Sequence, residues 1–228
     1  ALIQRINSDL ANDLGNLVSR TVGMIEKYFD GKIPADREET EFDASLKDTA
    51  KAVTEKVDTL LDKMLFSDAL TEIWTLIRRS NKYVDETQPW VLAKDDSQKA
   101  KLANVLYNLS EAIRIVSVLI QPFMPNTPKL IWKQLGVSEG EATAWDSAKT
   151  WGVLPADTVY TKGDVIFPRI DMKKELAELA SKRADLERQI DERRRSDPRK
   201  AAAALENLVQ LYPTMSPADK NSALKALG

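Results

Sequence analysis

Apolar residues recur at helical spacing along most of the chain, which predicts a structure built almost wholly from α-helices. The expected helices cover about residues 2–29, 46–64, 67–87, 97–120 and 127–136. The fourth is the most apolar and is expected at the centre of the fold. The first carries a continuous apolar face, made by Ile3, Ile6, Leu10, Leu14, Leu17, Thr21 and Tyr28. Together the five helices predict an all-α bundle.

Proline and glycine mark where these helices begin and end. Pro89 disfavours a helical conformation at Gln88 and predicts a corner in the chain there. Thr127 is expected to cap the fifth helix, with Pro128 at its first position, and Gly136 is expected to end it.

The chain changes character after residue 136. Residues 158–160 and 165–167 are β-prone and flank a Thr-Lys-Gly-Asp turn, which predicts a small β-hairpin. Trp145 and Trp151 are expected to pin this segment to the bundle. The predicted organisation is therefore a bundle over 1–136, a connecting segment over 137–171, and a tail over 172–228.

The tail begins with a short heptad pattern. Its members alternate spacings of four and three: Met172, Leu176, Leu179, Arg183, Leu186 and Ile190. Such a stripe predicts a helical, coiled-coil-like tail that lacks a partner within the chain. Self-association through residues 172–194 is the expected use of this stripe.

Composition excludes most catalytic chemistry. The 228 residues include no cysteine and no histidine, so neither a thiolate metal site, a disulfide nor a histidine base can form. No catalytic residue and no metal site is predicted. A net charge of −2 also lacks the broad basic footprint of nonspecific nucleic-acid binders, so any RNA contact is expected to be local.

The chain carries no clear membrane or secretion signal. Even the apolar stretch 102–120 is interrupted by Asn108, Glu111 and Arg114, so no membrane partner is expected. No signal peptide is visible and the first residue is not methionine. These features favour a cytoplasmic protein and a chain taken from a longer one.

Asn12, Asn16 and Arg20 form a polar stripe opposite the apolar face of the first helix. From spacing alone, the solvated side of an amphipathic helix is the favoured interpretation. The alternative is that this stripe and Trp90, just after the corner, form one surface that binds unstacked bases. Amides and a guanidinium can hydrogen-bond to the edge of a base, and an indole can stack on its face. By its residue type alone, Trp90 is predicted to lie in the core, as are Trp74 and Trp132.

Four ordered blocks change this balance. They are Asn12–Arg20, Val22–Pro34, Asn81–Asp95 and Pro122–Thr127. All four resemble the anticodon-binding helical domain of methionyl-tRNA synthetases, and residues 151–171 resemble the stretch that closes this domain in short bacterial members. The resemblance covers about residues 1–175 and implies a five-helix anticodon-binding bundle.

The resemblance also implies roles for individual residues. Trp90 matches the family's platform for the first anticodon base, a cytosine. Asn16 and Arg20 match residues that hydrogen-bond the anticodon, and Asn12 and Asp85 match positions that shape the base pocket. A carboxylate at Asp85 suits acceptance of the cytosine amino group, which uracil lacks.

The family reaction is ATP-dependent attachment of methionine to its tRNA. Neither the His-rich signature nor the Lys-Met-Ser-Lys-Ser type loop of its catalytic domain occurs in this sequence. The resemblance therefore implies that ATP and methionine bind an absent catalytic domain and that this chain alone is inactive and needs no cofactor. The expected partners are the CAU anticodon loop of methionine tRNA and that catalytic domain.

A second class of function stays open. From about residue 180 the tail weakly resembles the coiled-coil region of large serine recombinases, which is consistent with an engineered fusion. In this alternative the bundle is a helical scaffold and the tail is an interaction or oligomerisation module.

Overall fold

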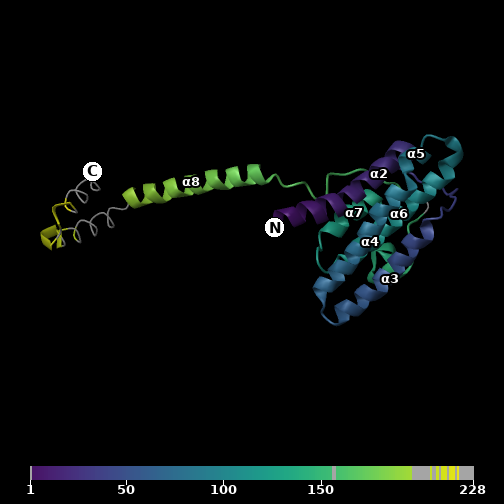
Figure 1. The fold of residues 1–228 in the computed structure, drawn as a ribbon, viewed down its shortest axis with the longest axis horizontal. Helices are drawn as coiled ribbons and strands as arrows, with labels where there is room; N and C mark the ends of the chain where they lie inside the picture. The colour runs from purple at the N-terminus through teal and green to yellow at the C-terminus, as the bar shows by residue number, and fades with distance from the viewer. Residues whose placement is uncertain are drawn as a thin grey trace. The chain divides into compact units, whose positions relative to one another are not determined.

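The computed structural model describes residues 2–155 and 158–196, together with residues 206, 209, 210, 212–214, 216–218 and 220. Contacts within the chain define two compact units, residues 1–170 and residues 171–228. The first unit is a bundle of helices (Figure 1) and the second contains a long single helix.

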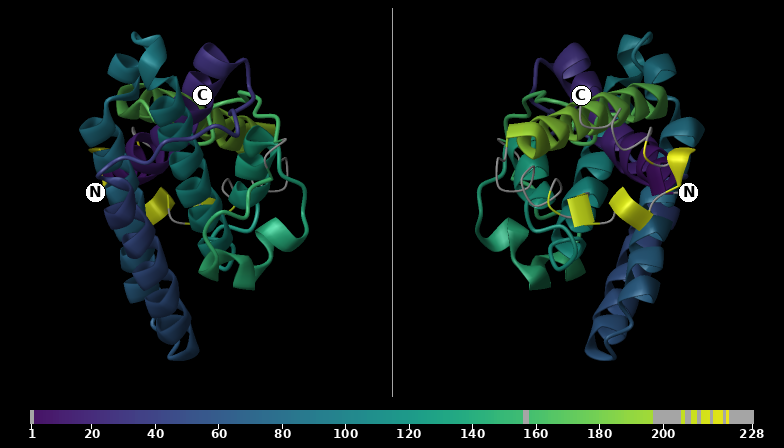
Figure 2. Two further views of the ribbon diagram at one scale, coloured as in Figure 1. Left: turned by 90° about the vertical axis from the view of Figure 1, so that its right-hand side faces the viewer. Right: turned by 90° about the vertical axis from the view of Figure 1, so that its left-hand side faces the viewer.

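The helices of the first unit follow the apolar periodicity of the sequence, so the prediction of an all-α bundle is confirmed. The long helices are α2 (Asn16–Phe29), α3 (Asp43–Asp62), α4 (Phe66–Thr87), α6 (Lys99–Leu119) and α7 (Thr127–Leu135). Consecutive helices α3 and α4 lie side by side as a long helical pair, visible in both Figure 1 and Figure 2. Shorter helical pieces are α1 (Leu2–Arg5), α5 (Pro89–Leu92), and 3-10 turns at Asp96–Gln98, Glu141–Thr143 and Trp145–Lys149.

Helix α6 forms the centre of the core, as its composition predicts. Nearly every residue from Leu102 to Leu119 is buried, and α2, α3, α4 and α7 all pack against it. Together with the turn before it, α6 is long and apolar enough to cross a bilayer, so the expectation that no stretch of the chain is long and apolar enough is wrong. However, 94% of its most apolar window is buried inside the bundle. Packing among the other helices therefore accounts for its composition.

The first helix departs from the expected single α-helix. Between α1 and α2, residues Ile6–Gly15 form a π-helix (η1), and the amide of Asn16 donates to the carbonyl of Ala11, five residues earlier. A π turn holds more residues than an α turn. The helix therefore changes type between Asn12, on the π-helix, and Asn16, at the start of α2.

The predicted β-hairpin in the connecting segment is wrong. Within residues 158–170 the structure describes no strand, because the backbone groups bond to the bundle instead of to each other. The amide of Tyr160 donates to the carbonyl of Gly31 at 2.8 Å, and the amide of Thr161 donates to that of Gln134 at 3.0 Å. The segment then closes on the first helix, where the side chain of Asn7 pairs with both backbone groups of Ile170.

Close approach to the bundle depends on a glycine at the end of α7. Gly136 has a φ of 69°, a left-handed conformation that suits glycine. A Cβ at this position would lie 2.0 Å from the carbonyl oxygen of Val159. Only a residue without a side chain lets the connecting segment pass here.

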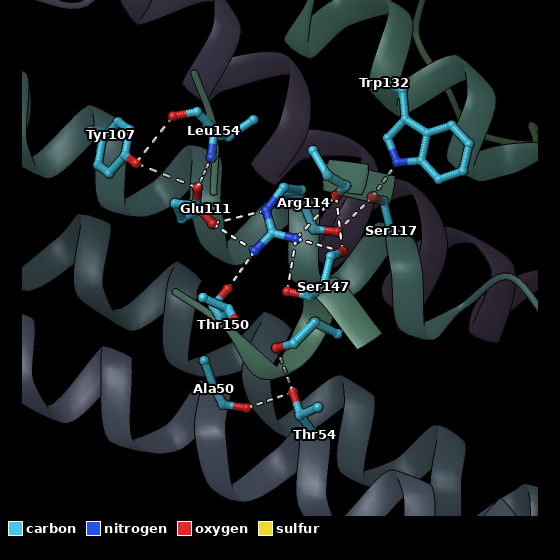
Figure 3. Close-up of polar contacts among 12 residues, drawn as sticks. Ala50, Thr54, Tyr107, Glu111, Arg114, Ser117, Trp132, Ser147, Thr150 and Leu154 are labelled. Atoms are coloured by element: carbon cyan, nitrogen blue, oxygen red, sulfur yellow. Dashed lines mark hydrogen bonds and ion pairs between the residues drawn. The ribbon is translucent and has the colours of Figure 1, made fainter. Parts of the chain in front are cut away.

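A buried ion pair fixes the middle of the connecting segment (Figure 3). The side chains of Glu111 and Arg114, both on α6, are fully buried and lie 2.9 Å apart. Arg114 donates further hydrogen bonds to the carbonyls of Ala142, Ser147 and Thr150. The other carboxylate oxygen of Glu111 accepts the amide of Leu154.

The connecting segment is also held by two tryptophans, as expected. Trp145 donates its indole N–H to Asp58 of α3 at 2.7 Å, and Trp145 and Trp151 both pack against the core. The segment is therefore attached through side chains and backbone along its whole described length.

The second unit contains α8 (Met172–Ser196), which runs unbroken through residues 172–194. The apolar members of the heptad pattern are exposed, namely Met172, Leu176, Leu179, Leu186 and Ile190. Nothing within the described part of this unit covers the stripe, and partner binding by it remains a prediction.

Removal of the Arg114 guanidinium should destabilise the first unit strongly. We expect Arg114→Met to lower the free energy of unfolding by about 3–5 kcal/mol, because it leaves the Glu111 carboxylate buried and three carbonyls without their donor. Urea denaturation followed by circular dichroism measures this change. The matched control is Lys149→Ala, which removes solvent-exposed ion pairs with Asp58 and Asp146 and should leave stability almost unchanged. Equal losses in both variants would contradict a special role for the buried pair.

Candidate nucleic-acid interface

The five residues expected to contact RNA come from four helical segments. Asn12 lies on the π-helix and Asn16 and Arg20 lie on α2, whereas Asp85 is near the end of α4 and Trp90 is in α5. Four of the five side chains are exposed, and Arg20 is half-buried. The side-chain amides of Asn12 and Asn16 form no hydrogen bond within the described residues, so these groups are free to bind a ligand.

Arg20 is held in place by a residue that the sequence did not single out. Its Nη2 donates to the side-chain oxygen of Asn81 at 2.8 Å and lies 3.4 Å from the carbonyl oxygen of the same residue. The side-chain nitrogen of Asn81 in turn donates to the carbonyls of Asp13 at 3.1 Å and Ile77 at 3.2 Å. Asn81 therefore joins α4 to both the π-helix and α2.

Electrostatics link Arg20 to Asp85. Burial lowers the pKa of the Arg20 guanidinium from its ordinary value, and the negative charge of Asp85 opposes that change. Arginine remains charged in proteins, so the site presents a cation whose charge interacts with that of an exposed carboxylate. The Nε of Arg20 is enclosed and has no hydrogen-bond partner within the described residues.

Trp90 lies after a sharp corner, as predicted from Pro89. Helix α4 ends at Thr87, and Gln88 adopts a left-handed conformation with φ 44° and ψ 61°. This conformation is uncommon for a residue with a side chain. Pro89 then begins α5 at a position where a helix needs no amide donor.

The exposure of the tryptophans separates their roles. Trp90 is 43% exposed, so the prediction of a core position from its residue type alone is wrong. Trp132 is only 5% exposed and donates its indole N–H to Ser117. Trp74 is partly buried against the core. Among these three, Trp90 alone offers an open aromatic face at a chain corner.

A buried network supports the end of α4 from inside the bundle. The hydroxyl of Tyr83, two residues before Asp85, donates to the carboxylate of Asp43 at 2.6 Å. Asn104 also donates to that carboxylate, and Asn108 donates to the Tyr83 hydroxyl. These contacts with α3 and α6 hold the helix that carries Asp85.

The arrangement suits recognition more than catalysis. It combines an aromatic face, a fixed cation, an exposed carboxylate and two free amides, which together can stack on a base and read its edge. Within the described ranges, no group of three or more Asp and Glu side chains is arranged to hold a metal ion.

Comparison with known proteins defines the class of this fold. Residues 33–188 match the model of the "Anticodon binding domain of methionyl tRNA ligase". Methionine–tRNA ligase of Caldanaerobacter subterraneus is 56% identical over 182 residues, which is 80% of this chain and 28% of the relative. That of Halalkalibacterium halodurans is 52% identical over 79% of this chain and 27% of its own length.

A solved structure agrees with these relatives. The apo form of Mycobacterium tuberculosis methionyl-tRNA synthetase superposes with a TM-score of 0.68 at 36% identity, covering 75% of this chain and 34% of that one. The fold is thus that of a helical anticodon-binding domain. The chain belongs to the family of anticodon-binding domains of methionyl-tRNA ligases. It spans about a third or less of the length of these relatives.

The comparisons do not support the expected recombinase resemblance of the tail. The family match extends to residue 188, inside α8. The Clostridium acetobutylicum ligase is 46% identical over 209 residues, or 92% of this chain, so similarity to a ligase continues well into the tail.

Acidification should test the network that supports α4. Burial raises the pKa of Asp43, but hydrogen bonds from Thr40, Tyr83 and Asn104 outweigh it and lower the pKa below its ordinary value of 3.8. The folded state therefore binds its proton less readily than the unfolded chain, so the stabilisation is complete above about pH 4 and is lost as the pH falls through the folded pKa.

The measurement is the difference in the free energy of unfolding between the wild type and Asp43→Asn, from pH 7 down to pH 3. We expect this difference to be largest at neutral pH and to shrink in acid. A difference that stays constant across the range would show that the ionised carboxylate does not contribute.

Proposed function

We propose that this chain reads the CAU anticodon loop of methionine tRNA as part of a methionine–tRNA ligase. The proposal rests on family membership together with one observation, the exposed Trp90 at the corner just after the helix that carries Asp85, whose charge acts on Arg20. An unstacked base needs an aromatic surface and groups that match its edge, and the site offers both.

The charges of Arg20 and Asp85 favour cytosine over uracil. Cytosine presents an acceptor at N3 beside an amino group at its 4-position, whereas uracil presents an N–H donor and a carbonyl at these positions. A guanidinium suits the N3 acceptor and a carboxylate suits the amino group. With uracil both contacts would become unfavourable, so the pair discriminates by repulsion as well as by attraction.

The remaining predicted residues extend this surface along the first helix. Asn12 and Asn16 are exposed amides that can donate to and accept from bases or the RNA backbone. Asn12 lies on the π-helix and Asn16 begins α2, so the two amides lie about one turn apart along the first helix.

Catalysis belongs elsewhere in the proposed protein. ATP and methionine would bind a catalytic domain outside this chain, and the chain alone would be inactive. Its role is to position the tRNA by its anticodon, so that binding energy gained here favours the correct tRNA. The proposed location is the cytoplasm.

The test is binding of the chain to a CAU anticodon stem-loop and to the same stem-loop with UAU, measured by fluorescence anisotropy at fixed salt. We expect the CAU loop to bind roughly 10- to 100-fold more tightly, as a well-matched base edge allows. Trp90→Ala should weaken CAU binding by about fivefold or more, because the stacking surface is lost.

Val91→Ala is the matched control, since it truncates an equally exposed apolar neighbour in the same helix. It should bind the CAU loop like the wild type. Equal affinity of the wild type for both loops, or equal loss in the two variants, would refute anticodon reading through Trp90.

The exposed stripe of α8 favours a second function, self-association. If Leu176, Arg183 and Ile190 occupy the a positions of a parallel two-stranded coiled coil, Lys182 of one copy faces Glu187 of the other, which is an attractive pair. A second copy of the chain is therefore the proposed partner of residues 172–194, and in this alternative the bundle acts as a scaffold.

Light scattering at increasing protein concentration tests this function. We expect the mass of the wild type to rise towards that of a dimer, and Leu179→Glu to remain a monomer because it places a charge in the apolar stripe. Ser181→Glu, on the opposite side of the helix, should behave like the wild type. A wild type that stays monomeric at high concentration would exclude this role.

A further inference from the structure

Asn81 is the most highly connected polar residue at the candidate interface. Its side-chain oxygen accepts from Arg20, and its side-chain nitrogen donates to two carbonyls, one on its own helix and one on the π-helix. The family resemblance did not assign it a role. The side chain of an asparagine inside a helix usually faces solvent or forms a weak hydrogen bond with the preceding turn. The side chain of Asn81 also bonds to two other helical segments, α2 and the π-helix.

The contacts of Asn81 limit how Arg20 can bind a ligand. Both acceptors of Nη2 belong to Asn81, at 2.8 Å and 3.4 Å, and Nε is enclosed without a partner. A guanidinium has five N–H groups. With Nη2 engaged and Nε enclosed, Nη1 is the nitrogen that remains to donate to a base.

The contact with the π-helix gives Asn81 its own fixed position. The bond from its Nδ2 to the Asp13 carbonyl links α4 to the last turn of η1 at 3.1 Å, just before α2 begins. The amide can then point only its oxygen at Arg20, because its nitrogen is directed to carbonyl oxygens. The register of the π-helix therefore sets the direction of the guanidinium.

We propose that Asn81 is a positioning residue for the first anticodon base: it fixes Arg20 so that Nη1 alone faces the base, beside Asp85. This inference rests on the proposed function. The inference goes beyond that function because it makes selectivity for cytosine depend on Asn81, a residue that does not itself contact the RNA.

Asn81→Ala is the direct test, with the CAU and UAU stem-loops as probes of the full chain. Without Asn81, Arg20 can rotate and offer Nη2 or Nε to other acceptors, including the oxygens of uracil. We expect the ratio of the two affinities to fall by about fivefold or more. A residue that only supports the fold would weaken both affinities and leave their ratio unchanged.

Asn108→Ala is the matched control. It also removes an amide that bonds to a neighbouring helix, but its partner is the buried hydroxyl of Tyr83. Thermal unfolding of both variants gives their stabilities, and binding is measured where both are fully folded. Asn108→Ala should retain the selectivity of the wild type.

A double-variant cycle identifies the route of the effect. If Asn81 acts through Arg20, adding Asn81→Ala to Arg20→Ala should not lower the ratio of affinities further. Separate, additive losses would overturn the inference, as would an Asn81→Ala variant with the selectivity of the wild type. If instead the wild type does not distinguish the two loops, the proposed function itself fails, and the role of Asn81 fails with it.

Discussion

The buried pair of Glu111 and Arg114 is the interaction on which the first unit depends. It lies on the central helix, yet most of its hydrogen bonds go to the backbone of residues 142–154. That segment forms only short 3-10 turns, which satisfy only part of its backbone polar groups. One guanidinium and one carboxylate supply partners that a strand or helix would otherwise provide. The segment is thereby fixed on α6. Further along the chain, its backbone also bonds to the carbonyls of Gly31 and Gln134 and, at Ile170, to the side chain of Asn7.

The bundle could be predicted from sequence because its information is periodic. Apolar residues at helical spacing located α2, α3, α4, α6 and α7, and Pro89 located the corner before Trp90. The connecting segment could not be predicted in this way. Thr158–Tyr160 has the residue types of a strand, but the amides of Tyr160 and the following Thr161 bond to Gly31 and Gln134 of the bundle, which residue preference does not encode.

The candidate site shows the same limit at the scale of single residues. The spacing of Asn12, Asn16 and Arg20 is compatible with an α-helix, and nothing in it signals the change to a π-helix at Ile6–Gly15. The family resemblance supplied the candidate residues, but only the structure shows that Trp90 is exposed. Asn81 was inside a recognised block, but its importance comes from its side-chain contacts with two other helices, which no local pattern reveals.

The unbroken helix α8 also sets a length scale. At 1.5 Å per residue, its 25 residues extend about 37 Å, which is more than the diameter of a small domain. A helix of this length acts as a spacer, since its stiffness keeps its two ends apart in a way that a flexible linker of the same number of residues does not. Insertion or removal of one turn would change the spacing by about 5 Å while keeping nearly the same face towards a partner. The tail is therefore suited to act as a rigid spacer of fixed length as well as to offer a surface for a partner helix.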